Sequence, residues 1–278
     1  MAHIKLGDIA LYYDLKGGGK GGGDETVVFA NGLTMTAAAW AEVEPHFASR
    51  YRTLLYDCRG QGGSDKPPGP YTPEGHAADL IALLDGLGLE RVHLVGHSNG
   101  GLLSALAAAE LAQRSPGRVM SLSLVASFLR LDPLLRATLA SWRAALDAGG
   151  PTLRFDVAAP WVWGRSFLET RGDELERYRD AASQADPQVI GWLIDGLLSL
   201  GDARKALRAY GGPVLAAVGQ DDLLTPLRMS HEIVEWANQG ILVTIDRAGH
   251  GVPIERPEAL ARVVRGFLER RDEAITPL

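Results

Sequence analysis

The sequence predicts an α/β protein in which helices cover both faces of a mainly parallel sheet. Short apolar runs rich in Val, Leu, Ile and Tyr alternate with longer helical patterns, which is typical of such sheets. The alternation is interrupted once, over residues 130–210, where apolar residues recur at helical spacing and no convincing strand occurs. We therefore expect a core of residues 1–129 and 211–278 and a helical insertion of residues 130–210.

The individual elements follow from apolar periodicity and from proline at helix-initiating positions. The expected strands are residues 9–15, 27–30, 53–56, 92–95, 119–125, 214–218 and 242–245. The expected helices are residues 37–48, 73–87, 99–113, 227–238 and 257–271. Residues 17–23 hold six glycines around Lys20, which are costly to order and predict a mobile loop. A phosphate-binding role for this loop is disfavoured, because it precedes a strand and not a helix N-terminus.

Composition and charge exclude several classes of partner. The 278 residues are 46% hydrophobic and 22% charged, and acidic and basic residues are interspersed at a formal charge of -6, so we expect no nucleic-acid partner. No apolar run approaches the roughly 18 to 20 residues needed to cross a bilayer, so we expect no membrane insertion. Cys58 is the single cysteine, and the first thirty residues lack signal-peptide features. These features predict a cytoplasmic protein and leave its oligomeric state open.

Ser98 is the candidate nucleophile. Residues 96–100, GHSNG, match GxSxG, but in a chain with 33 glycines this short pattern is weak without its context. An apolar strand precedes it and an alanine-rich helix follows, which puts Ser98 on a sharp strand-to-helix turn. Gly96 and Gly100 would let the strand and helix approach without side-chain collision.

A serine hydroxyl needs a base within hydrogen-bonding reach, and that base needs an orienting acid. Among the seven histidines, only His250 lies in a Gly-His-Gly loop directly after a late strand, at the sheet edge where Ser98 should emerge. Asp221 and Asp222 follow the strand of residues 214–218, and both give the chain order Ser, Asp, His. The two adjacent aspartates compete for the role of the acid.

These motifs together resemble the α/β-hydrolase superfamily, especially its esterase and enol-lactonase-like branch, over nearly the whole chain apart from the insertion. The family's GxxDxxxP spacing implies Asp222 as the acid, with Asp221 as a solvated or turn-capping residue. Some members move the acid to the position that Asp132 occupies. Residues 57–64, DCRGQGGS, match the family's DxRGxGxS segment at every fixed position.

The resemblance also implies an oxyanion hole made of two backbone N–H groups, those of Leu33 and Asn99. This chain has Asn31-Gly32 where the family usually has His-Gly. Gly32 should preserve the turn that presents the Leu33 N–H. Asn31 either replaces the histidine with an amide hydrogen bond at the substrate pocket or has a purely structural role.

By the same resemblance, the insertion is a helical cap that follows the family's sixth strand, here residues 119–125, and roofs the active site. Four of the six tryptophans lie in it. Trp161 and Trp163 lie in a PWVW segment that resembles a pocket-lining cap segment, with Phe128 beneath it. Most of the cap aromatics are expected to dock the cap onto the core. The composition favours a substrate with an apolar acyl or aryl group.

The expected function is hydrolysis of a carboxylic ester or lactone through an acyl-enzyme on Ser98. The same triad also serves C–C bond hydrolysis, thioester hydrolysis, perhydrolysis and acyl transfer, and some relatives are non-catalytic ligand receptors. Haloalkane dehalogenases and epoxide hydrolases need a carboxylate at position 98. There is no HExxH motif or cysteine cluster, so we expect no metal, no cofactor and a small-molecule substrate.

Overall fold

A computed structural model describes residues 2–17 and 24–269, so the glycine-rich loop expected at 17–23 lies almost entirely outside the described residues. Its strands are β1 (Ala2–Leu6), β2 (Ile9–Lys16), β3 (Thr26–Ala30), β4 (Arg52–Tyr56), β5 (Val92–His97), β6 (Val119–Val125), β7 (Pro213–Gly219) and β8 (Gln239–Ile245). They form one sheet in the order β1-β2-β4-β3-β5-β6-β7-β8. The pairs β1–β2 and β2–β4 are antiparallel and all the others are parallel.

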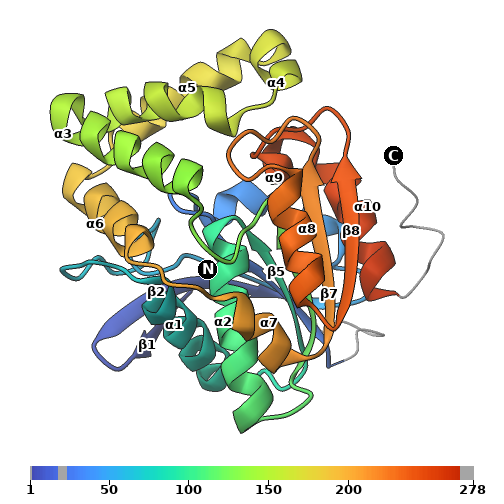
Figure 1. Cartoon of the computed structure of the whole chain (residues 1–278). Helices are drawn as coiled ribbons and strands as arrows, with labels where there is room; N and C mark the ends of the chain where they lie inside the picture. Colours follow the sequence, from blue (N-terminus) through green and yellow to red (C-terminus); the bar gives the residue numbers. More distant parts are fainter. Residues whose placement is uncertain (1, 18–23, 270–278) are drawn as a thin grey trace.

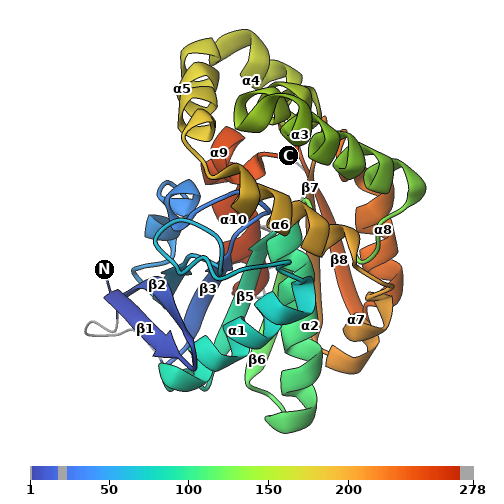
Figure 2. The same ribbon diagram turned by 90° about the vertical axis from the view of Figure 1, so that its left-hand side faces the viewer.

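Helices cover both faces of this sheet (Figures 1 and 2). The core helices are α1 (Pro73–Gly86), α2 (Asn99–Arg114), α7 (Arg204–Tyr210), α8 (Leu227–Trp236), α9 (Val252–Glu255) and α10 (Pro257–Leu268), with 3-10 turns η1 (Ala37–Trp40) and η2 (Glu44–His46). One face packs against α1, α2, α7 and α8, and the opposite face packs against η1, η2 and α10. The predicted α/β-hydrolase architecture is therefore confirmed.

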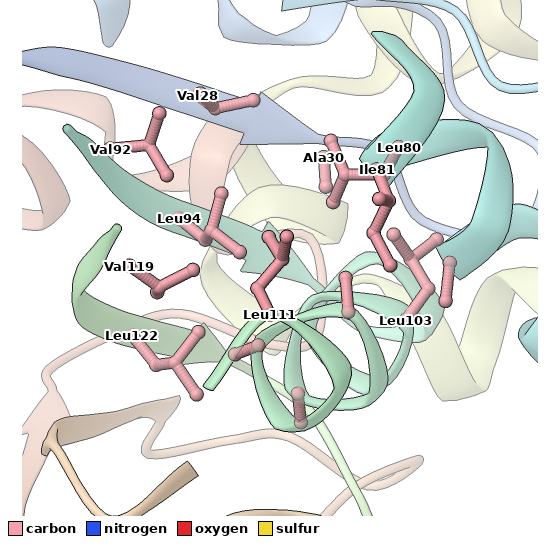
Figure 3. Close-up of a cluster of buried hydrophobic side chains, with 14 of the residues drawn as sticks. Val28, Ala30, Leu80, Ile81, Val92, Leu94, Leu103, Leu111, Val119 and Leu122 are labelled. Atoms are coloured by element: carbon pink, nitrogen blue, oxygen red, sulfur yellow. The ribbon is translucent and has the colours of Figure 1, made fainter. Parts of the chain in front are cut away.

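A fully buried apolar layer joins the sheet to α2 and positions the turn between β5 and α2. Leu94 and Leu122 project from the sheet toward Leu103 and Leu111 of α2, and all four side chains are at most 1% exposed (Figure 3). Burying each such side chain contributes roughly 1.5 to 3 kcal/mol. This layer fixes α2 against β5 and β6, and with it the backbone around Ser98.

Four further helices form a layer beyond the carboxyl ends of the strands, in the upper half of Figures 1 and 2. They are α3 (Pro133–Val162), α4 (Arg165–Thr170), α5 (Gly172–Ser183) and α6 (Pro187–Leu198). Gly149 and Gly150 break α3 into two halves, and Gly150 has a φ of +73° that favours glycine. Helix α7 belongs to the expected insertion by sequence, but it packs against α2, and its Leu207 is buried in the core. Within residues 2–17 and 24–269, no helix has the length and apolar character needed to span a bilayer.

The structure differs from the expected elements in two places, a predicted helix and a strand that was not predicted. The helix predicted for residues 37–48 is wrong, because the segment forms only η1 and η2. Trp40 and Phe47 are buried there, with ring centroids 5.1 and 5.5 Å from Phe29, so docking of two aromatic rings overrides the alanine-rich helix propensity. Strand β1 was not predicted. None of its five residues is buried, as expected of an edge strand with mixed polarity.

The close approach of α2 to β3 generates a stability prediction. A Cβ on Gly100 would lie 2.2 Å from the carbonyl oxygen of Ala30, whereas a Cβ on Gly172, at the start of α5, would meet nothing within 4 Å. We expect Gly100→Ala to lower the free energy of unfolding by about 1 to 3 kcal/mol or more, because overpacking outweighs the helix-propensity gain. The matched Gly172→Ala should leave it unchanged or raise it. Urea unfolding of both variants measures this, and equal midpoints would contradict the inferred contact.

Candidate functional site

Ser98 lies at the turn between β5 and α2 in a backbone conformation that side-chain-bearing residues rarely adopt. Its φ is 54° and its ψ is -120°, which is strained and typical of functional turns. The Ser98 N–H donates to the Val125 carbonyl at 2.8 Å, and the Ser98 carbonyl accepts from Ser127 Oγ at 2.8 Å. A Cβ on Gly96 would lie 2.2 Å from the Gly100 carbonyl oxygen. Bonds on both sides of the residue therefore hold the turn that the sequence predicted.

Asp222 and His250 meet beside this turn. His250 Nδ1 lies 3.1 Å from Asp222 Oδ2, and both side chains are buried. Asp222 Oδ1 accepts the backbone N–H groups of Leu224 and Thr225 at 2.9 and 2.8 Å. Burial alone would raise the pKa of the Asp222 carboxyl, but the charge of His250 and the hydrogen bonds from His250 and Thr225 outweigh it and lower that pKa. Asp222 is thus held as an anion against His250.

The other two aspartates that the sequence offered lie elsewhere. Asp221 is exposed. Asp132 accepts the Leu135 N–H at the start of α3 and pairs with Arg228 at 2.7 Å. Of the three candidates, Asp222 is the one that bonds to His250.

Thr225 completes this group, although it was not among the residues predicted from the sequence. Its hydroxyl donates to Asp222 Oδ2 at 2.7 Å and lies 3.0 Å from His250 Nδ1. Since a hydroxyl has one proton, Nδ1–H of the imidazole is the donor toward both oxygens. Neutral His250 then carries its proton on Nδ1 and leaves Nε2 free as an acceptor.

Among the described residues, the Ser98 hydroxyl makes no hydrogen bond to His250 or to any other group. Catalytic hydrogen bonds in ligand-free sites are often long and tighten in the substrate complex. The Ser98–His250 pairing therefore stays a prediction from the sequence, supported by the placement of both residues at one end of the sheet.

His97 connects the serine turn to the histidine loop. Its Nε2 donates to the His250 carbonyl at 2.7 Å, and the two imidazole centroids lie 4.8 Å apart. A Cβ on Gly32 would lie 2.7 Å from His97 Nδ1. Burial, together with nearby His250, lowers the pKa of His97 to about 3. This side chain is therefore neutral and packs between the turn after β3 and the histidine loop.

Glu255 holds the histidine loop to the helical layer above it. One carboxylate oxygen accepts the N–H groups of Gly249 and Gly164 at 2.9 and 3.1 Å, and the other accepts that of Gly251 at 3.1 Å. The His250 N–H in turn donates to the Val162 carbonyl at 2.8 Å. Burial raises the pKa of Glu255, and the three N–H donors partly offset that rise. The loop is therefore bonded to the core and to the predicted cap at the same time.

The turn after β3, which carries the predicted oxyanion residue Leu33, is held by Gln61. Gln61 Nε2 donates to the carbonyls of Gly32 and Leu33 at 2.7 and 3.0 Å. Because a trans peptide points its C=O and N–H in opposite directions, bonding the Gly32 carbonyl to Gln61 turns the Leu33 N–H away from Gln61. Asn99 is the first residue of α2, so its N–H has no acceptor within the helix and lies at the positive end of the helix dipole.

Asn31 bonds within the core at both ends of its side chain. It is fully buried, its Nδ2 donates to the Tyr56 carbonyl at 2.9 Å, and its Oδ1 accepts from Trp40 Nε1 at 3.0 Å. These contacts favour the structural role over a direct contact with substrate.

The aromatic residues expected at the substrate lie in two settings. Phe128 is 2% exposed and belongs to an apolar cluster between the helical layer and the core, which we call the cap–core cluster, and Trp161 packs against it. Its buried members are Leu102, Phe128, Leu135, Leu139, Trp142, Leu146, Ala158, Ile190, Ile194, Leu197, Leu200, Ala203, Leu224 and Met229. Trp163 instead stacks on Phe167 at 4.3 Å, close to Gly251 of the histidine loop.

Four residues of this site escaped the sequence analysis: Gln61, His97, Thr225 and Glu255. Gln61, His97 and Thr225 lie inside segments that had been singled out as DCRGQGGS, GHSNG and the run after residue 219, so their position was a usable signal. Glu255 carried none, because its partners are backbone N–H groups up to 91 residues away. Within the described ranges, no group of three or more His, Cys, Asp or Glu side chains could hold a metal ion.

Comparison with known proteins identifies a family and several related proteins. The chain matches the family described as alpha/beta hydrolase fold over residues 25–257. It is 30% identical over 261 residues to "Putative carbamate hydrolase RutD" of Caulobacter sp. (strain K31), covering 93% of this chain and 95% of the relative. The fold superimposes on the enol-lactonase from Burkholderia xenovorans LB400 with a TM-score of 0.85 at 24% identity, covering 96% and 100% of the two chains. A thermophilic esterase from Thermogutta terrifontis gives 0.84 at 24% identity, covering 99% and 100%.

The Glu255 contacts generate a second prediction. In Glu255→Gln the amide NH2 cannot accept, so at least one of the three backbone N–H groups loses its partner. We expect the free energy of unfolding to fall by about 1 to 3 kcal/mol, as measured by urea unfolding. The exposed Glu176→Gln in α5 is the matched control and should stay within about 0.5 kcal/mol of wild type. Equal losses of unfolding free energy in the two variants would show that Glu255 does not hold the histidine loop.

The buried His97 generates a pH prediction. In the unfolded chain this side chain takes up a proton below about pH 6.5, whereas in the fold it does so only near 3. The unfolded state therefore binds more protons in this window, and stability falls as the pH falls from 6.5 toward 3. We expect His97→Gln, which keeps an N–H donor, to show a shallower loss of melting temperature between pH 7 and 5. The exposed His231→Gln should keep the wild-type slope, and a wild-type slope in His97→Gln would contradict the assignment.

Proposed function

Because the chain belongs to the α/β-hydrolase family, we propose that it is a serine hydrolase that cleaves a carboxylic ester or lactone bearing an apolar acyl or aryl group. The observation that carries this proposal is the bonded pair of Asp222 and His250 beside the strained turn at Ser98. Small-molecule hydrolysis also agrees with the hydrolase names of the relatives.

In the proposed reaction, Ser98 Oγ attacks the substrate carbonyl while His250 Nε2 removes its proton. Asp222 stabilises the imidazolium that forms, and Thr225 keeps the Nδ1–H directed at the carboxylate. The carbonyl oxygen gains negative charge, which the N–H groups of Leu33 and Asn99 would accept. Such a donor is typically worth about 2.7 to 4 kcal/mol in the transition state.

The acyl-enzyme then forms as the leaving alcohol takes the proton from His250. Water attacks the same carbonyl with His250 again as the base, and the acid and free Ser98 are released. In a lactone, the leaving hydroxyl stays attached to the product. The buried setting of Ser98 and His250 beneath the helical layer supports a site that excludes bulk water and strengthens these electrostatic effects.

A second substrate class is favoured by the relatives named as carbamate hydrolases. A carbamate places its carbonyl between nitrogen and oxygen, and the same nucleophile and oxyanion donors would act on it. The same groups also serve thioester hydrolysis, acyl transfer and C–C bond hydrolysis. The receptor alternative has no specific observation in its favour.

The nucleophile assignment is tested with 4-nitrophenyl esters, simple lactones, a phenyl carbamate, a thioester and a dienoate ring-cleavage product. We expect Ser98→Ala to lower kcat by about a millionfold on each substrate that the wild type turns over. Asp222→Asn should lower kcat by about ten thousandfold, because the imidazole loses its fixed tautomer. The exposed Ser183→Ala is the control and should behave as wild type.

The same panel decides between the alternatives. Turnover that survives in Ser98→Ala would exclude Ser98 as the nucleophile. The substrate with the highest kcat/KM identifies the bond class. Tight binding of a panel member with negligible turnover by the wild type would favour the receptor alternative instead.

A further inference from the structure

Arg154 is a buried cation without a partner. It lies in the second half of α3, is 7% exposed, and its Nε is fully enclosed without a hydrogen-bond partner. Within the described part of the chain, no carboxylate lies within ion-pair distance of it and no carbonyl accepts from it. Burial lowers its pKa to about 10, so the side chain still carries its charge near pH 7.

A second buried arginine in the same chain shows the usual arrangement. Arg118 is 6% exposed, pairs with Asp85 and donates from Nε to the Leu89 carbonyl at 2.8 Å. Burying an unpaired charge is strongly unfavourable, and proteins normally pair or neutralise such groups. Arg154 departs from this rule on the same face of α3 as the buried Ala158, where a ligand rather than the protein can supply the anion.

The position of Arg154 relates it to the proposed active site. Residues 154, 158 and 162 follow i, i+4 spacing and lie along one stripe of α3. Ala158 is a buried member of the cap–core cluster, and the Val162 carbonyl accepts the His250 N–H at 2.8 Å. The stripe that carries Arg154 therefore runs along the underside of the predicted cap to the histidine loop.

A second donor without a partner lies in the same cluster. Trp142, in the first half of α3, is 4% exposed, and its Nε1 is enclosed without an acceptor. The cluster also contains Leu102 of α2 and Phe128, which directly follows Ser127. Helix α3 therefore carries two enclosed donors without an acceptor, Trp142 Nε1 in its first half and Arg154 Nε in its second half.

We propose that Arg154 binds a carboxylate of the substrate, at the end of an apolar acyl chain remote from the carbonyl that Ser98 attacks. This inference rests on the proposed function and narrows its substrate class to acyl compounds with a distal carboxylate. Slightly more than two helical turns, about 12 Å, separate residue 154 from residue 162 at the histidine loop. A long arginine side chain covers part of that distance, and a chain of a few methylene groups would cover the rest.

The test compares two esters that differ only at the far end of the acyl chain. Mono-4-nitrophenyl adipate ends in a carboxylate where 4-nitrophenyl hexanoate ends in a methyl group. We expect the wild type to prefer the adipate ester in kcat/KM by about 10- to 100-fold, the range of a charged hydrogen bond. Arg154→Met should abolish this preference through KM and change kcat/KM for the hexanoate ester less than threefold.

Three further measurements separate a binding role from a structural one. Arg154→Lys should restore part of the preference, because it keeps the charge but loses the planar fork. Arg154→Met should raise the melting temperature, because it replaces an unpaired buried charge with an apolar side chain of similar length. Arg165→Met, at a cap arginine whose side chain is 83% exposed, should leave the preference unchanged.

Several results would overturn the inference. They are a wild type that does not prefer the adipate ester, equal loss on both esters in Arg154→Met, or a fall in melting temperature with the preference retained. If Ser98→Ala still hydrolyses both esters, the proposed role of Ser98 is wrong. The role of Arg154 is then tested by ligand binding instead of turnover. Adipamate and hexanamide, which carry the unreactive amide, are then titrated against Ser98→Ala by tryptophan fluorescence. Arg154-dependent binding of adipamate alone supports the inference, and equal binding of the two overturns it.

Discussion

The backbone of Ser98 is the constraint on which the rest of the site depends. A serine with a φ of 54° is strained by an amount on the order of 1 to 3 kcal/mol, and the surrounding structure has to hold it there. Strands β6 and β7 contribute to this, because the Ser98 N–H donates to the Val125 carbonyl of β6 and the Ala126 N–H donates to the Ala217 carbonyl of β7. The glycines at 96 and 100 remove the side chains that would keep α2 from approaching. The sheet and α2 together therefore present one side chain at the carboxyl edge.

The same edge explains why the histidine loop is bonded to two layers. Asp222 and Thr225 hold His250 by its side chain from the core, while the Val162 carbonyl holds it by its backbone from the helical layer. Glu255 joins the two sides through the N–H groups of Gly249 and Gly164. Movement of the helical layer would therefore change the position of His250. In the proposed site, the helical layer over the substrate and the loop that carries the base would therefore move together.

Much of the fold was predictable because local signals and tertiary structure agree. Strand β6 occupies the predicted residues 119–125, and α1 and α2 begin at the predicted Pro73 and Asn99. Disagreement arose where tertiary burial competed with propensity, as at Trp40, whose docking on Phe29 replaces a helix with a 3-10 turn. Strand β1 was not predicted from the sequence, because an exposed edge strand needs little apolar periodicity.

The site divides in the same way between local and long-range signals. Ser98 and His250 were selected from loop position and chain order, and the choice between two aspartates came from family spacing. Glu255 bonds only to backbone groups, and any residue type can supply these, so its partners leave no trace in the sequence. The lack of a partner at Arg154 is invisible for a related reason. A sequence shows which charges exist, and only the fold shows which of them remain unpaired.

The proposed role of Arg154 would also give the site a direction. Asp222 bonds to the His250 side chain, and Glu255 accepts the N–H groups of Gly249 and Gly251 on either side of it, so two acidic residues lie at the histidine loop. Arg154 lies eight residues before Val162, whose carbonyl accepts the His250 N–H, so the proposed carboxylate site lies along α3 away from these acidic residues. Negative charge at the histidine and positive charge in the roof would then allow an anionic acyl compound to bind in one direction only. Its carboxylate is repelled at the reacting end and attracted at the other, so the proposed Arg154 contact would orient the carbonyl toward Ser98 as well as add affinity.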